Sequence, residues 1–188
     1  ALSSAASDVY KRQVPNAGHL GVADLERDFN VTVVTQNVDN LHERAGSTHV
    51  IHLHGELTKV CSSRDPYNPH FVKELAPEEY EVKLGDKAGD GTQLRPFIVW
   101  FGESVPEIET AIRYVEQADI FVIIGTSLNV YPAAGLLNYV PRAAEVYLID
   151  PKPVDTHVMR PIHVIQKGAS EGVKELKALL TATQPPLP

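Results

Sequence analysis

Two histidines stand at the end of a β-branched, apolar segment, Val50-Ile-His-Leu-His54, immediately before Gly55. Alternate residues of a strand face the same side, so His52 and His54 would share one face. With His49 nearby they suggest a metal site, but a metal needs a third ligand and the spacing places none. A histidine that ends a strand is a better candidate for a general base, because imidazole exchanges a proton near neutral pH. This reasoning favours His54 as a base.

Polar side chains also follow an apolar segment at Thr35-Gln-Asn-Val-Asp39. Amide and carboxylate oxygens such as those of Gln36, Asn37 and Asp39 can hold ribose hydroxyls or a carboxamide. The same residue types are common in turns and at helix N-caps. Taken alone, these residues favour the turn and cap interpretation.

Two further positions offer groups that suit a nucleotide. Gly125-Thr126-Ser127 follows the apolar run 120–124, and backbone N–H groups and hydroxyls before a helix suit a phosphate. An ordinary strand-to-helix turn uses the same residues, and the segment is neither GxxxxGK[ST] nor GxGxxG. Asp150 follows the run 145–149 and could hold ribose hydroxyls, although capping a turn before Pro151 explains it equally well.

These residues need elements that place them side by side. Short apolar runs predict strands at 31–35, 50–54, 120–124, 145–149 and 163–165, and helical spacing predicts helices at 16–29, 37–44, 106–118, 131–139 and 169–182. The alternation predicts an α/β fold, a Rossmann-like parallel sheet with helices on both faces. Ligands of such sheets bind beyond the carboxyl ends of the strands. Residues 61–94, rich in Pro, Asp, Gly and Glu, predict a small inserted lobe.

Composition and charge exclude several classes of protein. The chain has 188 residues, of which 43% are apolar, and its net charge of −7 argues against non-specific binding to nucleic acid. No apolar run approaches the ~20 residues of a membrane helix, and no secretory signal is visible. A single cysteine, Cys61, excludes an internal disulfide and a four-cysteine zinc site, so we expect a reducing, cytoplasmic setting.

Both ends of the chain differ from the rest. Residues 1–13 are expected to be in-frame read-through of a sequencing-library adapter or, alternatively, a poorly ordered tail. The catalytic domain would then cover residues 14–183, and the proline-rich residues 184–188 would form a second tail.

Five ordered motifs resemble the sirtuins, the NAD-dependent protein deacylases. They are TQNVDNLHERAG (35–46), VIHLHGEL (50–57), RPFIVWFGESVP (95–106), IIGTSLNVYPAAGL (123–136) and VYLIDPKP (146–153). The resemblance runs from about residue 14 to residue 180. It implies a Rossmann-like domain and a smaller lobe, with NAD and an acyl-lysine peptide meeting between them.

The resemblance also implies roles for individual residues. His54 would be the catalytic base, with Asn37 and Asp39 as further catalytic groups, and Gln36, Asn37 and Asp39 would hold the nicotinamide ribose, the carboxamide and an ordered water. Other implied cofactor contacts are Gly125, Thr126, Ser127, Asp150, Gly168 and Ala169. The implied peptide-binding residues are Val99, Trp100, Phe101, Gly102, Glu103, Asn129, Val130 and Tyr131, with the peptide adding as a strand.

The chain departs from the family's pattern in three places. Where sirtuins have two CxxC pairs that bind zinc, Cys61 is followed by Ser62-Ser63-Arg64 and there is no second pair, so we predict no zinc and no other metal. The family's asparagine after the third strand is replaced by Ile149 or Asp150. The GAGxS and GIPxFR segments would lie upstream of Val14, so we expect the chain as written to bind NAD poorly and to show little activity.

Two functions of different class follow. The first is an NAD-dependent deacylase of protein lysines, with nicotinamide and acyl-ADP-ribose as products and acyl-lysine proteins as partners. The second is a catalytically silent module that binds acylated peptide or ADP-ribose. Mono-ADP-ribosyl transfer is a variant of the first on the same residues. Neither hypothesis involves nucleic acid or a membrane.

Overall fold

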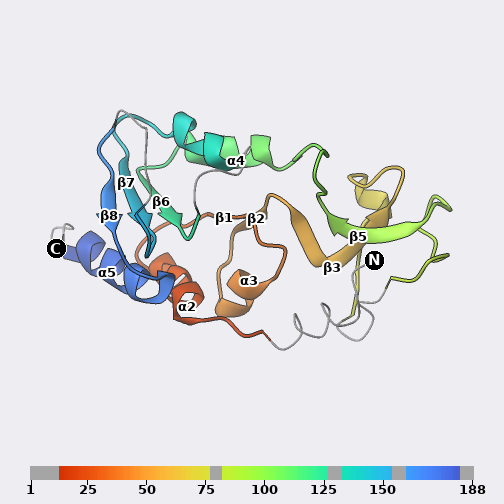
Figure 1. Ribbon diagram of the computed structural model, residues 1–188, viewed down its shortest axis with the longest axis horizontal. Coiled ribbons are helices and arrows are strands. Elements are labelled where there is room, and N and C mark those ends of the chain that lie inside the picture. The colour runs from red at the N-terminus through yellow and green to blue at the C-terminus, as the bar shows by residue number, and fades with distance from the viewer. Residues whose placement is uncertain (1–12, 77–81, 127–132, 154–159, 183–188) are drawn as a thin grey trace. The chain divides into compact units, whose positions relative to one another are not determined.

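The computed structural model divides the chain into two compact units, each with a three-stranded sheet of its own (Figure 1). Unit 1 contains Val34–Leu41 and Ile51–Glu107, and unit 2 contains Pro15–Val33, His42–Val50 and Ile108–Pro188. The structure describes residues 13–76, 82–126, 133–153 and 160–182.

Helices and strands alternate along the described chain. The α-helices are α2 (Ala17–Asp24), α3 (Leu41–Ala45), α4 (Ile108–Val115) and α5 (Ala169–Ala182), and the 3-10 helices are η1 (Leu25–Arg27), η2 (Pro69–Phe71) and η3 (Ala133–Tyr139). The strands are β1 (Val33–Thr35), β2 (Val50–His52), β3 (Gly55–Ser62), β4 (Lys73–Glu74), β5 (Leu94–Ile98), β6 (Ile120–Ile124), β7 (Glu145–Ile149) and β8 (His163–Ile165). None of the described helices is long and apolar enough to cross a membrane.

Unit 2 is built on a parallel sheet in the order β6-β7-β8. The register pairs Ile120 with Glu145 and Ile124 with Ile149, and it pairs Ile149 with Ile165 on the other side. Strands covered on both faces read as continuous apolar runs, which is why the sequence predicts the bounds of all three. Their carboxyl ends form one edge, which we call the carboxyl edge of unit 2.

One face of this sheet packs against α2 and α5. Tyr147, Ile149 and Ile165 form a buried cluster with side chains of the two helices, and α5 approaches β7 closely at Gly172. A Cβ atom at Gly172 would lie 2.2 Å from Cγ2 of Ile149, so only glycine fits between this helix and this strand. The helix members of the cluster are Val22, Leu25, Val173, Leu176 and Leu180.

The opposite face of the sheet is covered as well. Val146 and Leu148 alternate with the residues of the first face and are each 1% exposed. Figure 1 shows α4 on the side of the strands away from α5, and α4 buries Ala111 and Val115. Helices therefore cover both faces, which confirms the predicted Rossmann-like α/β class.

Unit 1 is built on an antiparallel sheet in the order β4-β3-β5. The register of β3 and β5 pairs Gly55 with Ile98 and Cys61 with Arg95, with an irregularity between Glu56 and Val60. Gly55 has φ +80°, and a Cβ there would lie 2.1 Å from the Phe97 oxygen, so glycine is required where β3 begins. The sequence did not predict β3, because the alternation after Gly55 is broken by this irregularity.

A polar network closes the end of β3. The Ser62 hydroxyl donates to Asp90 at 2.6 Å and accepts from the backbone N–H groups of Arg64 and Asp65. The Thr92 hydroxyl donates to the other Asp90 oxygen at 2.7 Å. Donors to the charged carboxylate lower the pKa of Asp90 to about 2, with the Ser62 hydroxyl as the largest cause. Side-chain hydrogen bonds thus join strands and loops of the predicted lobe.

Several predicted elements differ from the structure. The helix predicted at 16–29 is α2 followed by the 3-10 turn η1, the segment predicted as 131–139 is a 3-10 helix from Ala133, and the helix predicted from residue 37 begins only at Leu41. The elements predicted at 31–35, 50–54 and 106–118 are shorter, as β1, β2 and α4. Residues 36–40 instead form a loop, in which the Gln36 and Asn37 carbonyls bond to histidine rings and the Val38 carbonyl accepts the Leu57 N–H.

Candidate functional site

Unit 2 presents glycines around its carboxyl edge. Gly125 follows β6, has φ +60° and donates its N–H to the Ile149 carbonyl at 3.0 Å. A Cβ at Gly125 or at Gly168 would meet no atom of the described residues within 4 Å, so none of those residues covers either glycine. Thr126 is half-buried beside Gly125, and Ala169 begins α5. This edge can therefore accept a ligand close to the backbone.

Asp150 caps a turn, which is one of the two roles that the sequence leaves open for it. Its Oδ1 accepts the backbone N–H of Lys152 at 2.8 Å, and its own N–H donates to the Ile165 carbonyl at 3.3 Å. The carboxylate thus caps a turn after β7. A contact with ribose remains a prediction for this side chain.

Unit 1 carries the loop of residues 36–40, which follows β1. Backbone hydrogen bonds fix it at both ends: Leu53 N–H donates to the Thr35 carbonyl at 3.0 Å, and Leu57 N–H donates to the Val38 carbonyl at 2.9 Å. Within it, Asp39 Oδ1 accepts the N–H of Leu41, the first residue of α3, at 3.1 Å. The cap interpretation of Asp39 therefore describes its side chain in this structure.

The same loop orients His52, the last residue of β2, and His54, two residues beyond it. His54 Nδ1 lies 3.0 Å from the Gln36 carbonyl oxygen, and His52 Nδ1 lies 3.2 Å from the Asn37 carbonyl oxygen. A carbonyl oxygen only accepts, so each Nδ1 must carry the proton. In the neutral rings, Nε2 then has the lone pair. His54 is half-buried, and its Nε2 can act as a base.

The three histidines that suggested a metal do not converge. His49 belongs to unit 2, where its Nδ1 lies 2.9 Å from the Thr32 hydroxyl and its ring contacts Tyr114.

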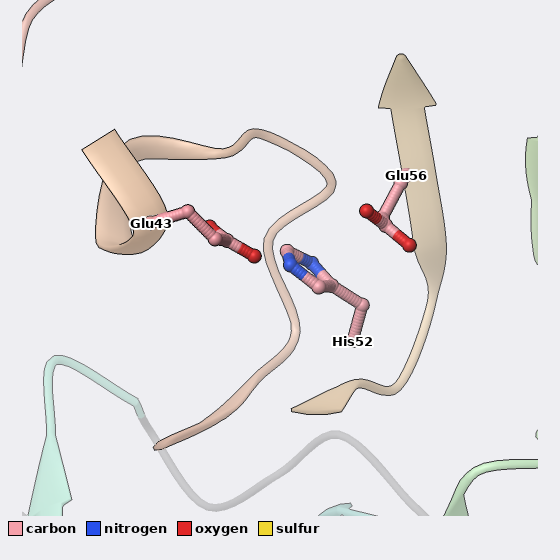
Figure 2. Close-up of side chains that lie close together, drawn as sticks. All are labelled: Glu43, His52 and Glu56. Carbon is pink, nitrogen blue, oxygen red and sulfur yellow. The ribbon is translucent and has the colours of Figure 1, made fainter. Parts of the chain in front are cut away.

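In unit 1, possible ligand atoms of His52 and Glu56 lie within 4.8 Å of each other (Figure 2). The Glu56 carboxylate already accepts a hydrogen bond from the Lys59 ammonium at 2.6 Å. Glu43, also drawn in Figure 2, belongs to unit 2. Two side chains, one of them paired with lysine, are fewer than the three or four protein ligands of the usual zinc site, and the absence of a metal stays a prediction.

The stretch predicted to bind the peptide lies next to His54. Val99 N–H donates to the His54 carbonyl oxygen at 2.9 Å, so β5 is tied at its end to the histidine. Beyond Val99 the chain turns, and Phe101 is fully exposed while Trp100 is 46% exposed. Gly102 and Glu103 complete this turn. The predicted residues Ser127, Asn129, Val130 and Tyr131 lie outside the described residues.

Cys61 lies in the core of unit 1. It is 0% exposed, and its thiol lies 3.7 Å from the Pro96 carbonyl oxygen. Burial raises the pKa of the Cys61 thiol, although Arg95 acts in the opposite direction. The thiol is therefore kept neutral, which suits a packing role better than metal binding or catalysis.

Sequence reasoning missed two groups in unit 1. The Asn40 side-chain oxygen is buried and has no hydrogen-bond partner among the described residues. Arg95 binds Glu103 through two hydrogen bonds, although sequence reasoning assigned Arg95 no role. Arg95 opens the motif RPFIVWFGESVP, so its place in that motif was a signal; nothing in the sequence pointed to the buried oxygen of Asn40.

The parallel sheet with helices on both faces places this chain in the class of Rossmann-like α/β proteins. The sequence model of the Sir2 family matches residues 2–132, which is more than half of the chain. The chain belongs to the Sir2 family.

Individual relatives and solved structures agree with this assignment. A protein of Bacteroides thetaiotaomicron named NAD-dependent protein deacylase is 84% identical over 166 residues, which cover 88% of this chain and 71% of the relative. A crystal structure of a Sir2 homolog–NAD complex gives a TM-score of 0.76 at 36% identity and covers 93% of this chain and 68% of that chain. A Sir2–p53 peptide–NAD+ structure gives 0.74 at 26% identity, with 93% and 74% covered.

Proposed function

We propose that this chain carries catalytic residues of an NAD-dependent protein deacylase, which removes acyl groups from lysine side chains and yields nicotinamide and acyl-ADP-ribose. The observation that carries the proposal is the setting of His54. Its Nδ1 is held by the Gln36 carbonyl, and its own carbonyl holds the start of the peptide-binding stretch at Val99. The name of the 84% identical relative supports the same activity.

The described residues fit NAD in each unit. In unit 2, Gly125 and Gly168 leave open space at the carboxyl edge, where a phosphate or ribose can approach the backbone. In unit 1, the buried, unpartnered oxygen of Asn40 would accept a donor such as a carboxamide N–H or a ribose hydroxyl. We assign the remaining predicted cofactor contacts, among them Gln36, Asn37, Asp39, Thr126, Asp150 and Ala169, to the same ligand.

His54 would move one proton in this reaction. Bound NAD supplies an electrophilic ribose carbon with nicotinamide as its leaving group. With Nδ1 protonated against the Gln36 carbonyl, Nε2 of His54 can remove a proton from a ribose hydroxyl. Because the partner of Nδ1 is a neutral carbonyl that the backbone fixes, the ring keeps its orientation while Nε2 gains and loses the proton.

We further propose that the partner is a protein or peptide with an acylated lysine, which adds along the end of β5 at Val99. Main-chain hydrogen bonds of an added strand accept many sequences, while the exposed side chains of Trp100 and Phe101 would contact the acyl-lysine or its neighbours. The p53 peptide in the related complex supports this class of partner. The net charge of −7 and the lone cysteine support a cytoplasmic protein that does not bind nucleic acid.

The test compares His54→Ala with His49→Ala in a chain extended upstream of Val14 with a relative's GAGxS and GIPxFR segments, in an assay of nicotinamide release from NAD and an acetyl-lysine peptide. The unsubstituted extended chain is the wild type of this test. His49 is a matched control, because it is a histidine with a hydroxyl partner in the other unit. We expect H54A to lower turnover by about 10²–10⁴-fold, the range for loss of a general base. We expect H49A to keep its turnover.

Two results would contradict the proposal. Turnover by H54A at the wild-type rate would remove His54 as the base. Peptide binding by the wild-type chain without any NAD-dependent turnover would instead favour the catalytically silent binding module.

A further inference from the structure

The segment after β5 is a hydrogen-bonded turn rather than a continuing strand. Glu103 N–H donates to the Trp100 carbonyl at 3.0 Å, and Trp100 N–H donates back to Oε2 of Glu103 at 3.1 Å. Gly102 has φ +89°, a conformation that glycine adopts without strain. The turn places Trp100 and Phe101 at its exposed tip.

Arg95 holds this turn through a planar pair of hydrogen bonds. Its Nη1 lies 2.8 Å from Oε1 of Glu103, and its Nη2 lies 3.1 Å from Oε2. The Arg95 side chain is 18% exposed and the Glu103 side chain 34% exposed. A bidentate pair fixes the orientation of the carboxylate as well as its distance, and partial burial reduces screening by water.

The backbone of Arg95 is itself fixed in the sheet. Arg95 lies in β5 opposite Cys61, a residue with no exposed surface. The guanidinium is the main cause that holds the pKa of the Glu103 carboxyl below its ordinary value. On the far side of the turn, the Tyr67 hydroxyl donates to the Ser104 carbonyl at 3.1 Å. The turn is thus tied to the lobe from two directions, and to His54 through Val99.

We propose that Arg95 and Glu103 are positioning residues, which lock the turn of residues 100–103 so that Trp100 and Phe101 stand in a fixed place against the bound acyl-lysine peptide. Neither residue needs to touch the reacting atoms. The inference rests on the proposed function, because it takes the end of β5 as the peptide site. Glu103, predicted to contact the peptide, instead acts on the peptide through the turn.

The turn carries its own reporter. Trp100 is the only tryptophan of the chain, and its backbone N–H donates a hydrogen bond to the Glu103 carboxylate. Quenching of its fluorescence by acrylamide therefore measures the mobility and exposure of this turn without any ligand. Binding of a fluorescein-labelled acetyl-lysine peptide, measured by anisotropy, gives the functional consequence separately.

The main variant is the double substitution R95M/E103Q. Removing Glu103 alone would leave the half-buried Arg95 cation unpaired, which risks unfolding the lobe. The double variant removes both charges at once and keeps similar side-chain volumes. The control is Lys59→Gln, which breaks the ion pair of Lys59 with Glu56 in the same unit. Far-UV circular dichroism checks that each variant is folded.

We expect R95M/E103Q to raise the acrylamide quenching constant of Trp100 at least twofold and to weaken peptide binding at least tenfold. We expect K59Q to match the wild type in both. Where NAD-dependent turnover is measured, the peptide KM should rise while kcat and the KM for NAD stay unchanged, a split that general loss of structure would not produce.

Three results would overturn the inference. If the double variant matches the wild type in quenching, the pair of Arg95 and Glu103 does not hold the turn. If the double variant changes quenching but binds peptide normally, the turn does not position the peptide. If the wild-type chain binds no peptide, the peptide site of the proposed function fails, and the positioning role fails with it.

Discussion

Backbone carbonyls orient His52 and His54 in unit 1. The Gln36 and Asn37 carbonyl oxygens hold Nδ1 of His54 and of His52, while the sequence had assigned only the side chains of this loop. Side-chain types are visible in a sequence, but the direction of a carbonyl depends on the backbone path. The sequence therefore showed His54 as a candidate base, a role that stays a prediction, whereas it did not show how the ring is oriented.

At the same scale, the buried thiol of Cys61 should react slowly. Burial raises the pKa of this thiol, and the side chain is 0% exposed. Because the thiolate is the reactive form, iodoacetamide should label the folded chain far more slowly than the chain in 6 M guanidinium chloride. Mass spectrometry of the intact protein measures both rates. Equal rates in the two conditions would show that the thiol is accessible in the folded lobe.

Asp90 should make unit 1 sensitive to acid. Its pKa is lowered to about 2, first by the Ser62 hydroxyl and then by Thr92, from an ordinary value of 3.8. A carboxyl with a depressed folded-state pKa stabilises the fold above its unfolded-state pKa, and this contribution disappears as the pH falls from about 4 towards 2. We expect Asp90→Asn to lower the thermal midpoint at pH 7 and to weaken its decline over that interval.

The control for this prediction is Asp28→Asn, which changes an exposed carboxyl of unit 2. Its thermal midpoint should follow the wild-type curve from pH 7 to pH 2. A decline for D90N as steep as that of the wild type would mean that other carboxyl groups carry the acid sensitivity.

At the scale of elements, regular patterns were predicted well and irregular ones were not. The strands 120–124, 145–149 and 163–165 and the helix 169–182 have the predicted bounds, because each strand is a short, mainly apolar run and the helix has a clear apolar stripe. Strand β3 escaped prediction, since its register with β5 shifts between Glu56 and Val60. The turn at residues 100–103 escaped as well, because it depends on Arg95, five residues upstream of its start.

The contact of α5 with β7 should not tolerate a side chain at Gly172. A Cβ there would lie 2.2 Å from Ile149 Cγ2, and Ile149 is 0% exposed and cannot move aside into solvent. Overpacking a core costs about 1–3 kcal/mol, against a gain in helix propensity of about 1 kcal/mol for Gly→Ala. We expect Gly172→Ala to lower the free energy of unfolding in urea by up to about 2 kcal/mol.

Lys174→Ala is the matched substitution, because Lys174 is an exposed residue of the same helix. It changes helix propensity little and removes no buried contact, so its urea midpoint should stay near the wild-type value. A G172A variant as stable as K174A would show that α5 can shift away from β7 without loss.

At the scale of the whole molecule, the predicted site residues are divided between the two units. Unit 1 carries His54, the loop of residues 36–40 and the end of β5, which we propose for proton transfer, cofactor contacts and peptide binding. Unit 2 carries the carboxyl edge with Gly125, Asp150 and Gly168, which we propose for cofactor contacts alone. The proposed cofactor contacts therefore come from both units, whereas the proposed base and the described peptide-binding residues belong to unit 1.

The metal content of the whole chain provides the last test. The usual sirtuin pattern has two CxxC pairs that bind zinc, whereas this chain has a single cysteine, Cys61, whose thiol is buried and has a raised pKa. The same lobe is joined by the network of Ser62, Asp90 and Thr92 and by the pair of Arg95 and Glu103. These bonds join strands and loops of the lobe, so the lobe has means other than a metal of holding its segments together. We therefore expect less than about 0.1 zinc per chain by mass spectrometry, and a thermal midpoint that EDTA leaves unchanged. One zinc per chain, or a lower midpoint in EDTA, would mean that the hydrogen bonds and the ion pair do not replace the metal.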